Sequence, residues 1–261
     1  MPTNAQTDSY AKPFIRETLT SKSLFFTIYD VQSSMHIQRP DELQFEYTRL
    51  MMGLLLFNPR PKSILMVGLG GGSLAKFCYR YLPETQITVV EINPHVIALR
   101  KEFAVPDDDH RFTVEQGDAA TFIGRTERKF DIILADGFDD TGLPEQLSSR
   151  QYYDDCRRAL HSGGLIVANL HRCNKLFDIF LDRLQAAFDT PLLKVNDQGA
   201  SNCVVFAINQ SADLDGKLAG MRRPEYMDED AWKELLPSMA RVFLAARELE
   251  RSIRADRIVH A

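Results

Sequence analysis

The feature that most constrains the fold is an apolar run that ends in a glycine-rich turn, followed by a second apolar run that ends in an acid. The first reads Ile-Leu-Met-Val-Gly-Leu-Gly-Gly-Gly-Ser over residues 64–73, and the second reads Val-Val-Glu-Ile over residues 89–92. In parallel α/β proteins, glycines at such a turn let the backbone approach a nucleoside, and the acid on the next strand accepts hydrogen bonds from ribose hydroxyls. The sequence therefore predicts a nucleoside site that contains Gly68, Gly70, Gly72 and Glu91.

Segments with strand and helix patterns alternate from residue 63 to residue 208. Strands are predicted at 64–67, 86–91, 111–115, 131–135 and 164–169, and helices at 73–81, 94–102, 119–124, 149–160 and 174–187. Strands separated by helices form βαβ units with a parallel sheet. Two last strands, near 191–195 and 202–208, are joined by a short polar segment and are expected to form an antiparallel edge hairpin. The predicted fold is Rossmann-like α/β, with a mainly parallel seven-stranded sheet.

The two flanks of this region differ from it. Residues 13–38 show a β pattern, with a strand over 24–29 and a second short strand near 35–38, and a helix is predicted to start at 40–42. From about Asp228 a helical pattern carries an apolar stripe, interrupted by Pro237, that is expected to pack on the domain or on a second copy. The predicted division is a short β region over 1–40, a catalytic domain over 41–210 and a helical extension over 211–261. The stripe comprises Trp232, Leu235, Leu236, Met239, Val242 and Phe243.

Composition excludes several classes of protein. The net charge of −5 gives no indication of a nucleic-acid partner. No apolar run approaches the roughly 18 residues that a membrane span needs, and the N-terminus lacks the pattern of a signal peptide. The four cysteines lie far apart without a Cys-x-x-Cys motif, which argues against a zinc site or a disulfide framework. A cytoplasmic protein without a metal is therefore expected.

Carboxylates follow three consecutive strands at the edge where ligands bind in open parallel sheets. Glu91 follows the second strand, Asp118 the third, and a cluster of Asp136, Asp139 and Asp140 the fourth. An acidic crevice beside a nucleoside suits a cationic or amine substrate, and Asp136 could accept the proton of an attacking amine. Asp118 has two open interpretations: it could cap the helix that starts at the next residue, or accept the adenine amino group. His171 ends the fifth strand at the same edge and is a further candidate.

The segment from about Asp41 to Phe206 resembles the spermidine/spermine synthases, which are aminopropyltransferases built on the fold of the S-adenosylmethionine-dependent methyltransferases. The matching stretches occur in the same order and cover over half of the chain. They are residues 41–42, the glycine loop, 91–93, 117–119, 130–136, 152–153, 159–160 and 163–165.

The resemblance implies a role for each candidate residue. Glu91 would hold the ribose, with Ile92 in the same nucleoside site, and Asp118 and Ala119 would contact the adenine. Asp136 would accept the proton of the attacking amine, and Asp139 would help to hold the polyamine. The reaction implied is transfer of an aminopropyl group from decarboxylated S-adenosylmethionine to an amine such as putrescine, releasing methylthioadenosine. A homodimer is also expected.

Several positions depart from the family pattern. Gly71 stands where the family keeps an aspartate that faces the aminopropyl end of the donor. Phe45 and Glu46 replace a Tyr-Gln pair, so the tyrosine hydroxyl that would assist amine deprotonation is expected to be missing. The loop over residues 136–140 and the late substrate loop over 197–201 also differ. Two alternatives therefore stay open: an S-adenosylmethionine-dependent methyltransferase on the same fold, and a non-catalytic nucleoside-binding homologue.

Overall fold

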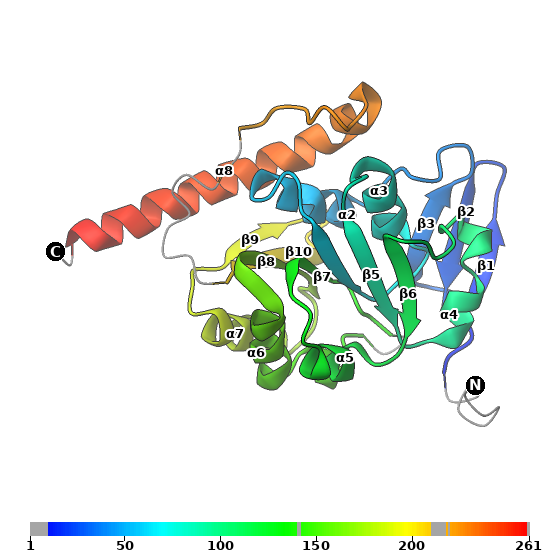
Figure 1. The fold of residues 1–261 in the computed structure, drawn as a ribbon, viewed down its shortest axis with the longest axis horizontal. Coiled ribbons are helices and arrows are strands. Elements are labelled where there is room, and N and C mark those ends of the chain that lie inside the picture. The colour runs from blue at the N-terminus through cyan, green and yellow to red at the C-terminus, as the bar shows by residue number, and fades with distance from the viewer. Residues whose placement is uncertain (1–9, 140–141, 210–217, 219, 260–261) are drawn as a thin grey trace.

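A seven-stranded sheet forms the centre of the computed structural model, which describes residues 10–139, 142–209, 218 and 220–259 (Figure 1). Its strands lie in the order β6-β5-β4-β7-β8-β10-β9. β10 is antiparallel to both of its neighbours, whereas the other pairs are parallel. The predicted Rossmann-like sheet with an antiparallel edge hairpin is confirmed. The strands are β4 (Ser63–Val67), β5 (Gln86–Glu91), β6 (Phe112–Gln116), β7 (Phe130–Ala135), β8 (Leu160–His171), β9 (Leu193–Asn196) and β10 (Asn202–Ile208).

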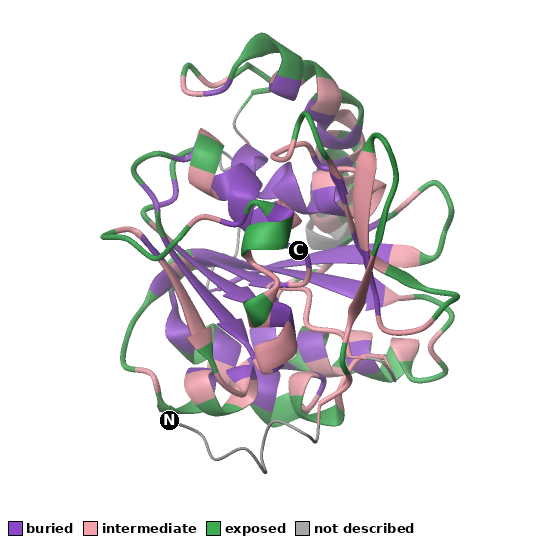
Figure 2. Cartoon of the chain, turned by 90° about the vertical axis from the view of Figure 1, so that its right-hand side faces the viewer, coloured by how far each residue is buried: buried purple, intermediate pink, exposed green. Residues whose placement is uncertain are grey.

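Helices cover both faces of the sheet, and the central strands are buried between them (Figure 2). Successive side chains of a strand point to opposite faces. In β4, accordingly, Ile64 and Met66 belong to one apolar cluster and Leu65 and Val67 to the other. The first cluster contains side chains of α2 (Glu46–Met51), η1 (Met52–Leu56), α3 (Ser73–Tyr81), α4 (Pro94–Ala98) and α8 (Glu229–Val259). The second contains side chains of α5 (Ala119–Arg125), α6 (Arg150–Ala159) and α7 (Phe177–Phe188).

The strand order reverses at β4. From this strand the chain continues to β5 and β6 on one side, and then returns to β7 and β8 on the other side. In open α/β sheets, ligands bind beyond the carboxyl ends of the strands at such a reversal. The segments that follow β4, β5 and β7 are therefore the expected walls of a binding site.

A separate three-stranded antiparallel sheet precedes the central one. It consists of β1 (Phe14–Glu17), β2 (Ser21–Phe25) and β3 (Val31–His36). The predicted β region is present, but the predicted strand over 24–29 is wrong, because residues 26–29 form the bend between β2 and β3. The Thr27 hydroxyl accepts hydrogen bonds from the backbone N–H groups of Tyr29 and Asp30, each at 3.3 Å. Such side-chain bonds offer the backbone an alternative to a strand ladder.

Two predicted helices have different bounds in the structure. The helix predicted from residue 40 begins only at Glu46, because Phe45 is extended and the Arg49 guanidinium donates to the carbonyls of Leu43 and Gln44. Those bonds hold the preceding segment outside the helix. The helix α2 therefore starts six residues later than predicted. The single helix predicted over 94–102 is divided into α4 and the short 3-10 helix η2 (Lys101–Phe103).

The C-terminal segment forms one long helix, α8, with Pro237 inside it. Leu235, Met239 and Val242 are buried, as the predicted stripe requires, whereas Leu236 is 37% exposed and does not belong to it. Figure 1 shows the N-terminal half of α8 lying along the body of the protein and its C-terminal end extending away from it. Within the described part of the chain, no helix has the length and apolar character needed to cross a membrane.

Candidate active site

A cavity of about 920 Å³ lies at the reversal point of the sheet. Eight of the nine predicted site residues line it. Gly72 is the exception. Segments from the N-terminal sheet and from the β9–β10 hairpin complete the wall of the cavity. The structure thus brings together residues that the sequence placed after separate strands. The eight are Gly68, Gly70, Glu91, Ile92, Asp118, Ala119, Asp136 and Asp139.

The glycine loop contributes backbone conformation and close packing. Gly68 has φ of +89°, and a Cβ there would lie 2.6 Å from the backbone oxygen of Asp136. Gly72 has φ of +68°, and a Cβ there would lie 2.4 Å from a methyl carbon of Val105. Larger residues are therefore excluded at both positions. Gly68 lets the ends of β4 and β7 approach each other, while Gly72 serves the packing behind the loop.

Glu91 stands at the end of β5 and is only 8% exposed. Its two oxygens accept hydrogen bonds from the backbone N–H groups of Leu69 and Asn93, each at 2.8 Å. Burial raises the pKa of the Glu91 carboxyl, against the lowering effect of these backbone bonds. The side chain therefore fixes the glycine loop and the turn after β5 at the wall of the cavity.

Asp118 caps a helix, which is one of the two interpretations that the sequence left open. Its Oδ1 accepts a hydrogen bond of 2.8 Å from the backbone N–H of Thr121 in the first turn of α5. Asp118 also lines the cavity. Because a carboxylate has a second oxygen, the cap leaves acceptor capacity for a ligand.

Asp136, directly after β7, is the polar centre of the opposite part of the cavity. The Asn169 amide donates to its Oδ1 at 3.0 Å, and the Tyr47 hydroxyl donates to its Oδ2 at 3.2 Å. Burial raises the pKa of the Asp136 carboxyl, whereas these two hydrogen bonds lower it. Burial and the Asp136 charge together raise the pKa of Tyr47, so the phenol remains a proton donor. A carboxyl group oriented by two donors, which favour its ionised form, is the arrangement that a general base requires.

The expectation that no tyrosine hydroxyl accompanies this acid is wrong. Tyr47 lies two residues after Phe45, which replaces the tyrosine of the family pattern. Because α2 starts at Glu46 instead of at residue 40, Tyr47 lies in its first turn and faces Asp136. Tyr47 could have been identified from the sequence only if the start of α2 had been predicted correctly.

The loop after Asp136 supplies a further acid. Asp139 lines the cavity, and its backbone pairs with that of Gly142 through hydrogen bonds of 2.9 and 3.3 Å. Asp140, the third member of the predicted cluster, lies outside the described residues. Phe138, which lies between Asp136 and Asp139 in the chain, stacks on His171 with ring centroids 4.0 Å apart. Burial lowers the pKa of His171, which favours its neutral form in this stack.

The charge of the cavity has one sign. Among the described residues that line it, seven are acidic and none is lysine or arginine. A buried anionic ligand group would lack a cationic partner here, whereas an ammonium group would find several. The acids are Asp30, Glu46, Glu91, Asp118, Asp136, Asp139 and Asp197.

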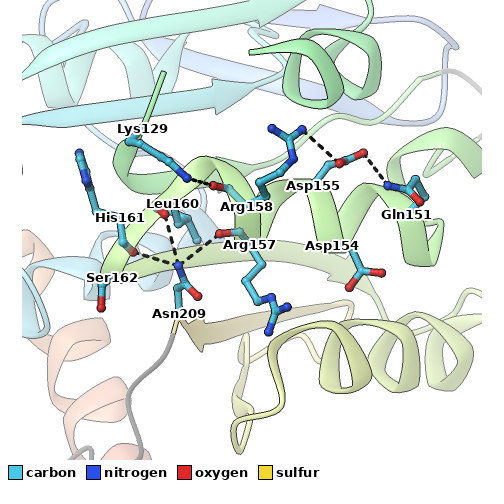
Figure 3. A pocket seen from close by; sticks show the side chains of 10 residues that line it. All are labelled: Lys129, Gln151, Asp154, Asp155, Arg157, Arg158, Leu160, His161, Ser162 and Asn209. Carbon is cyan, nitrogen blue, oxygen red and sulfur yellow. Dashed lines mark hydrogen bonds and ion pairs between the residues drawn. The ribbon is translucent and has the colours of Figure 1, made fainter. Parts of the chain in front are cut away.

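A second hollow, of about 660 Å³, lies at the other end of the sheet, where β8 begins (Figure 3). Its polar groups are mostly engaged with one another. The Asn209 amide donates to three backbone carbonyls, at 3.1 to 3.3 Å, and Arg158 pairs with Asp155 at 3.1 Å. This hollow is a structural junction of α6, β8 and β10, remote from the strand ends where ligands bind.

The fold, a mainly parallel sheet with a strand reversal and a glycine loop after β4, is shared by solved structures of a spermidine synthase and of a methyltransferase-like protein. Residues 44–187 match the model of the spermine/spermidine synthase domain. The chain is 36% identical over 201 residues to the polyamine aminopropyltransferase of Chromobacterium violaceum, covering 77% of each chain. It is 38% identical over 199 residues to that of Neisseria meningitidis serogroup B, covering 76% of each.

The chain belongs to the spermine/spermidine synthase family of transferases. A solved structure agrees with this at the level of the fold. The spermidine synthase from Thermotoga maritima superposes with a TM-score of 0.59 at 16% identity, over 87% of this chain and 88% of that one. Among the residues that the structure describes, no group of three or more histidines, cysteines or acids is placed to hold a metal ion.

Proposed function

We propose that the protein is a polyamine aminopropyltransferase whose reaction centre is Asp136. The amine nitrogen attacks the methylene carbon next to the donor's sulfonium, the C–S bond breaks, and the sulfur leaves with its electron pair as methylthioadenosine. The proton lost by the nitrogen passes to Asp136. The observation that carries the proposal is this buried carboxylate, oriented by Tyr47 and Asn169 in an acidic cavity.

Catalysis of this reaction depends mainly on position and protonation. The sulfonium is already an activated leaving group, so the protein must hold the two reactants in line and keep the amine uncharged. Asp136 would take the amine proton, with Tyr47 and Asn169 stabilising its ionised form. Glu91 and Asp118 would hold the nucleoside, and Asp139 would contribute to the amine side.

The charge of the cavity supports decarboxylated S-adenosylmethionine as the donor. The intact molecule carries a carboxylate, which would meet an acidic wall with no lysine or arginine among its described residues. An uncompensated charge is costly to bury. Removing that carboxylate leaves a donor with an ammonium at the end of the transferred chain, which suits the wall.

The family aspartate replaced by Gly71 could not simply be restored here. A Cβ at Gly71 would lie 2.5 Å from the hydroxyl oxygen of Ser33 and 3.0 Å from a ring carbon of Phe103. Ser33, from β3, is buried, lines the cavity and lies 3.4 Å from the hydroxyl of Ser73. The Ser33 hydroxyl thus occupies space that a side chain at position 71 would need.

The test is product formation combined with calorimetry. We expect methylthioadenosine and spermidine from putrescine and decarboxylated S-adenosylmethionine, with no methyl transfer from the intact donor. We also expect tighter binding of methylthioadenosine than of S-adenosylhomocysteine, whose amino-acid carboxylate would face the acidic wall. A clear preference for S-adenosylhomocysteine without aminopropyl product would support the methyltransferase alternative. Binding of either nucleoside without turnover of any amine would support the non-catalytic alternative.

A further inference from the structure

A second carboxylate in the cavity, like Asp136, accepts a hydrogen bond from an asparagine amide. Asp197, in the turn between β9 and β10, accepts a hydrogen bond of 2.8 Å from the Asn202 side-chain amide and one of 3.1 Å from the Ser201 hydroxyl. All three residues line the cavity. The sequence singled out this turn only as a departure from the family pattern, and the function proposed above gives it no role.

The two aspartates form two matched pairs with asparagines. Asn169 donates its amide to Asp136 and Asn202 donates its amide to Asp197, at 3.0 and 2.8 Å. In both asparagines the amide oxygen is buried and has no partner among the described residues. A buried acceptor without a donor is costly. Two such acceptors, each beside a carboxylate, are suited to two nitrogen groups of a ligand that donate hydrogen bonds.

The strand register places the two pairs on one face. Asn202 of β10 lies opposite His171 of β8, two residues along from Asn169. Side chains at i and i+2 of a strand, and at directly paired positions, point to the same face. The offset is roughly 7 Å along the strands and about 5 Å between them by standard sheet geometry. The stacked rings of Phe138 and His171, which also line the cavity, supply an apolar surface for a carbon chain.

The turn that carries Asp197 is held from outside the cavity by the C-terminal helix. Arg241 of α8 forms an ion pair with Glu46 and donates to the backbone carbonyl of Asn196. Glu46 in turn accepts a hydrogen bond of 2.8 Å from the backbone N–H of Gln198. The Arg241–Glu46 pair therefore fixes the residues on both sides of Asp197. It also neutralises Glu46, so Asp197 carries the charge at this part of the wall.

We infer that Asp197 and Asn202 bind the distal ammonium of a diamine whose other nitrogen reacts at Asp136, and that Arg241 of α8 is the positioning residue for Asp197. This inference rests on the proposed function, and it gives the helical extension a role in substrate selection. Asp30, another acid of the cavity wall, is exposed, and among the described residues no asparagine amide donates a hydrogen bond to its carboxylate.

The experiment compares putrescine with 1-aminobutane, which has the same carbon chain and one nitrogen. In the wild-type chain we expect a higher kcat/KM for putrescine, and in Asp197→Asn we expect the ratio of the two values to fall about tenfold or more, as for loss of a charge-assisted hydrogen bond. Asp182→Asn removes the same charge from the exposed side of α7 and should retain the ratio. An unchanged ratio in Asp197→Asn would overturn the inference.

Arg241→Gln tests the positioning role. We expect the KM for putrescine to rise several-fold while the KM for the donor stays constant, and the backbone amide of Gln198 to exchange faster with solvent. Arg247→Gln is the matched control, because Arg247 lies on the same helix and pairs with Glu250 at 3.0 Å. Unchanged exchange and an unchanged amine KM in Arg241→Gln would refute this role.

Failure of the inference can be distinguished from failure of the proposed function. A wild-type chain that turns over no amine contradicts the function, yet calorimetry of putrescine in the presence of methylthioadenosine still tests the Asp197 site. Putrescine binding that Asp197→Asn weakens supports the inference in that case. Equal binding by the two chains, or none by the wild type, overturns it.

Discussion

The two ends of the cavity are built in different ways. At the nucleoside end, Glu91 and Asp118 bond to backbone N–H groups of nearby segments, two to 22 residues away in the chain. At the amine end, Asp136 bonds to side chains 33 and 89 residues away, and the turn of Asp197 is held by Arg241 of α8. Local backbone geometry specifies the first end, whereas the packing of distant elements specifies the second. Substitutions at the nucleoside end should therefore affect mainly nucleoside binding, whereas the substitution of Asp136 at the amine end should affect mainly turnover.

The largest effect is expected from Asp136→Asn. An amide cannot accept the amine proton, so kcat should fall by roughly 10²–10⁴-fold, the usual contribution of a general base. Methylthioadenosine binding, measured by calorimetry, should change little, because the nucleoside end is intact. Turnover at the wild-type rate would show that Asp136 is not the proton acceptor.

Glu91→Gln should affect mainly the nucleoside end. Both oxygens of Glu91 accept backbone N–H groups, and a glutamine would face one of them with its own donor. We expect methylthioadenosine affinity to fall by about 10- to 100-fold and the free energy of unfolding by about 1–3 kcal/mol. Calorimetry and urea denaturation measure the two, with Glu115→Gln on the adjacent strand as a control. If both quantities stayed at wild-type values, Glu91 would have no role in organising this end.

Tyr47→Phe should have a smaller effect on turnover and shift its pH dependence. The hydroxyl stabilises ionised Asp136, so its loss should raise the pKa of Asp136 further. The active form is the ionised one, and turnover declines as pH falls through this pKa. The acid limb of the kcat profile should therefore move to higher pH, with kcat near neutrality reduced by about tenfold, equivalent to the roughly 1.4 kcal/mol typical of one hydrogen bond.

The control for Tyr47→Phe is Tyr81→Phe. The Tyr81 hydroxyl donates to Asp228 at 3.1 Å outside the cavity. The Tyr81→Phe substitution should therefore leave the pH profile of kcat unchanged. An acid limb that does not move in Tyr47→Phe would contradict the assignment of this hydroxyl to the reaction.

Asp118→Asn should have the smallest effect and should separate capping from ligand binding. Asparagine caps helices as well as aspartate does, so the melting temperature should not change. If the second carboxylate oxygen accepts the adenine amino group, methylthioadenosine affinity should fall by about three- to tenfold, the range of the net contribution of one typical hydrogen bond. Unchanged affinity would leave Asp118 with the capping role alone.

The fold and the nucleoside end could be predicted because their signals are local. The apolar run of β4 ends in glycines with positive φ, and β5 ends in the acid that holds the turns beside it. Periodicity and turn chemistry determine such units within some 30 residues. The same reasoning failed at residues 40–46, where the local sequence signals predicted a helix start. There the hydrogen bonds from the Arg49 guanidinium to the preceding backbone carbonyls set the start of α2 at Glu46.

By itself the sequence determined the alternating strands and helices, the glycine loop and the acids at the ends of β5, β6 and β7, because each depends on neighbours in the chain. Only the tertiary structure decided which side chains meet those acids. Tyr47 reaches Asp136 because α2 begins late, and Arg241 reaches the Asp197 turn because the apolar stripe of α8 packs over α2. The physical reason is that a hydrogen bond between distant residues depends on the packing of whole elements, and no local pattern encodes that placement.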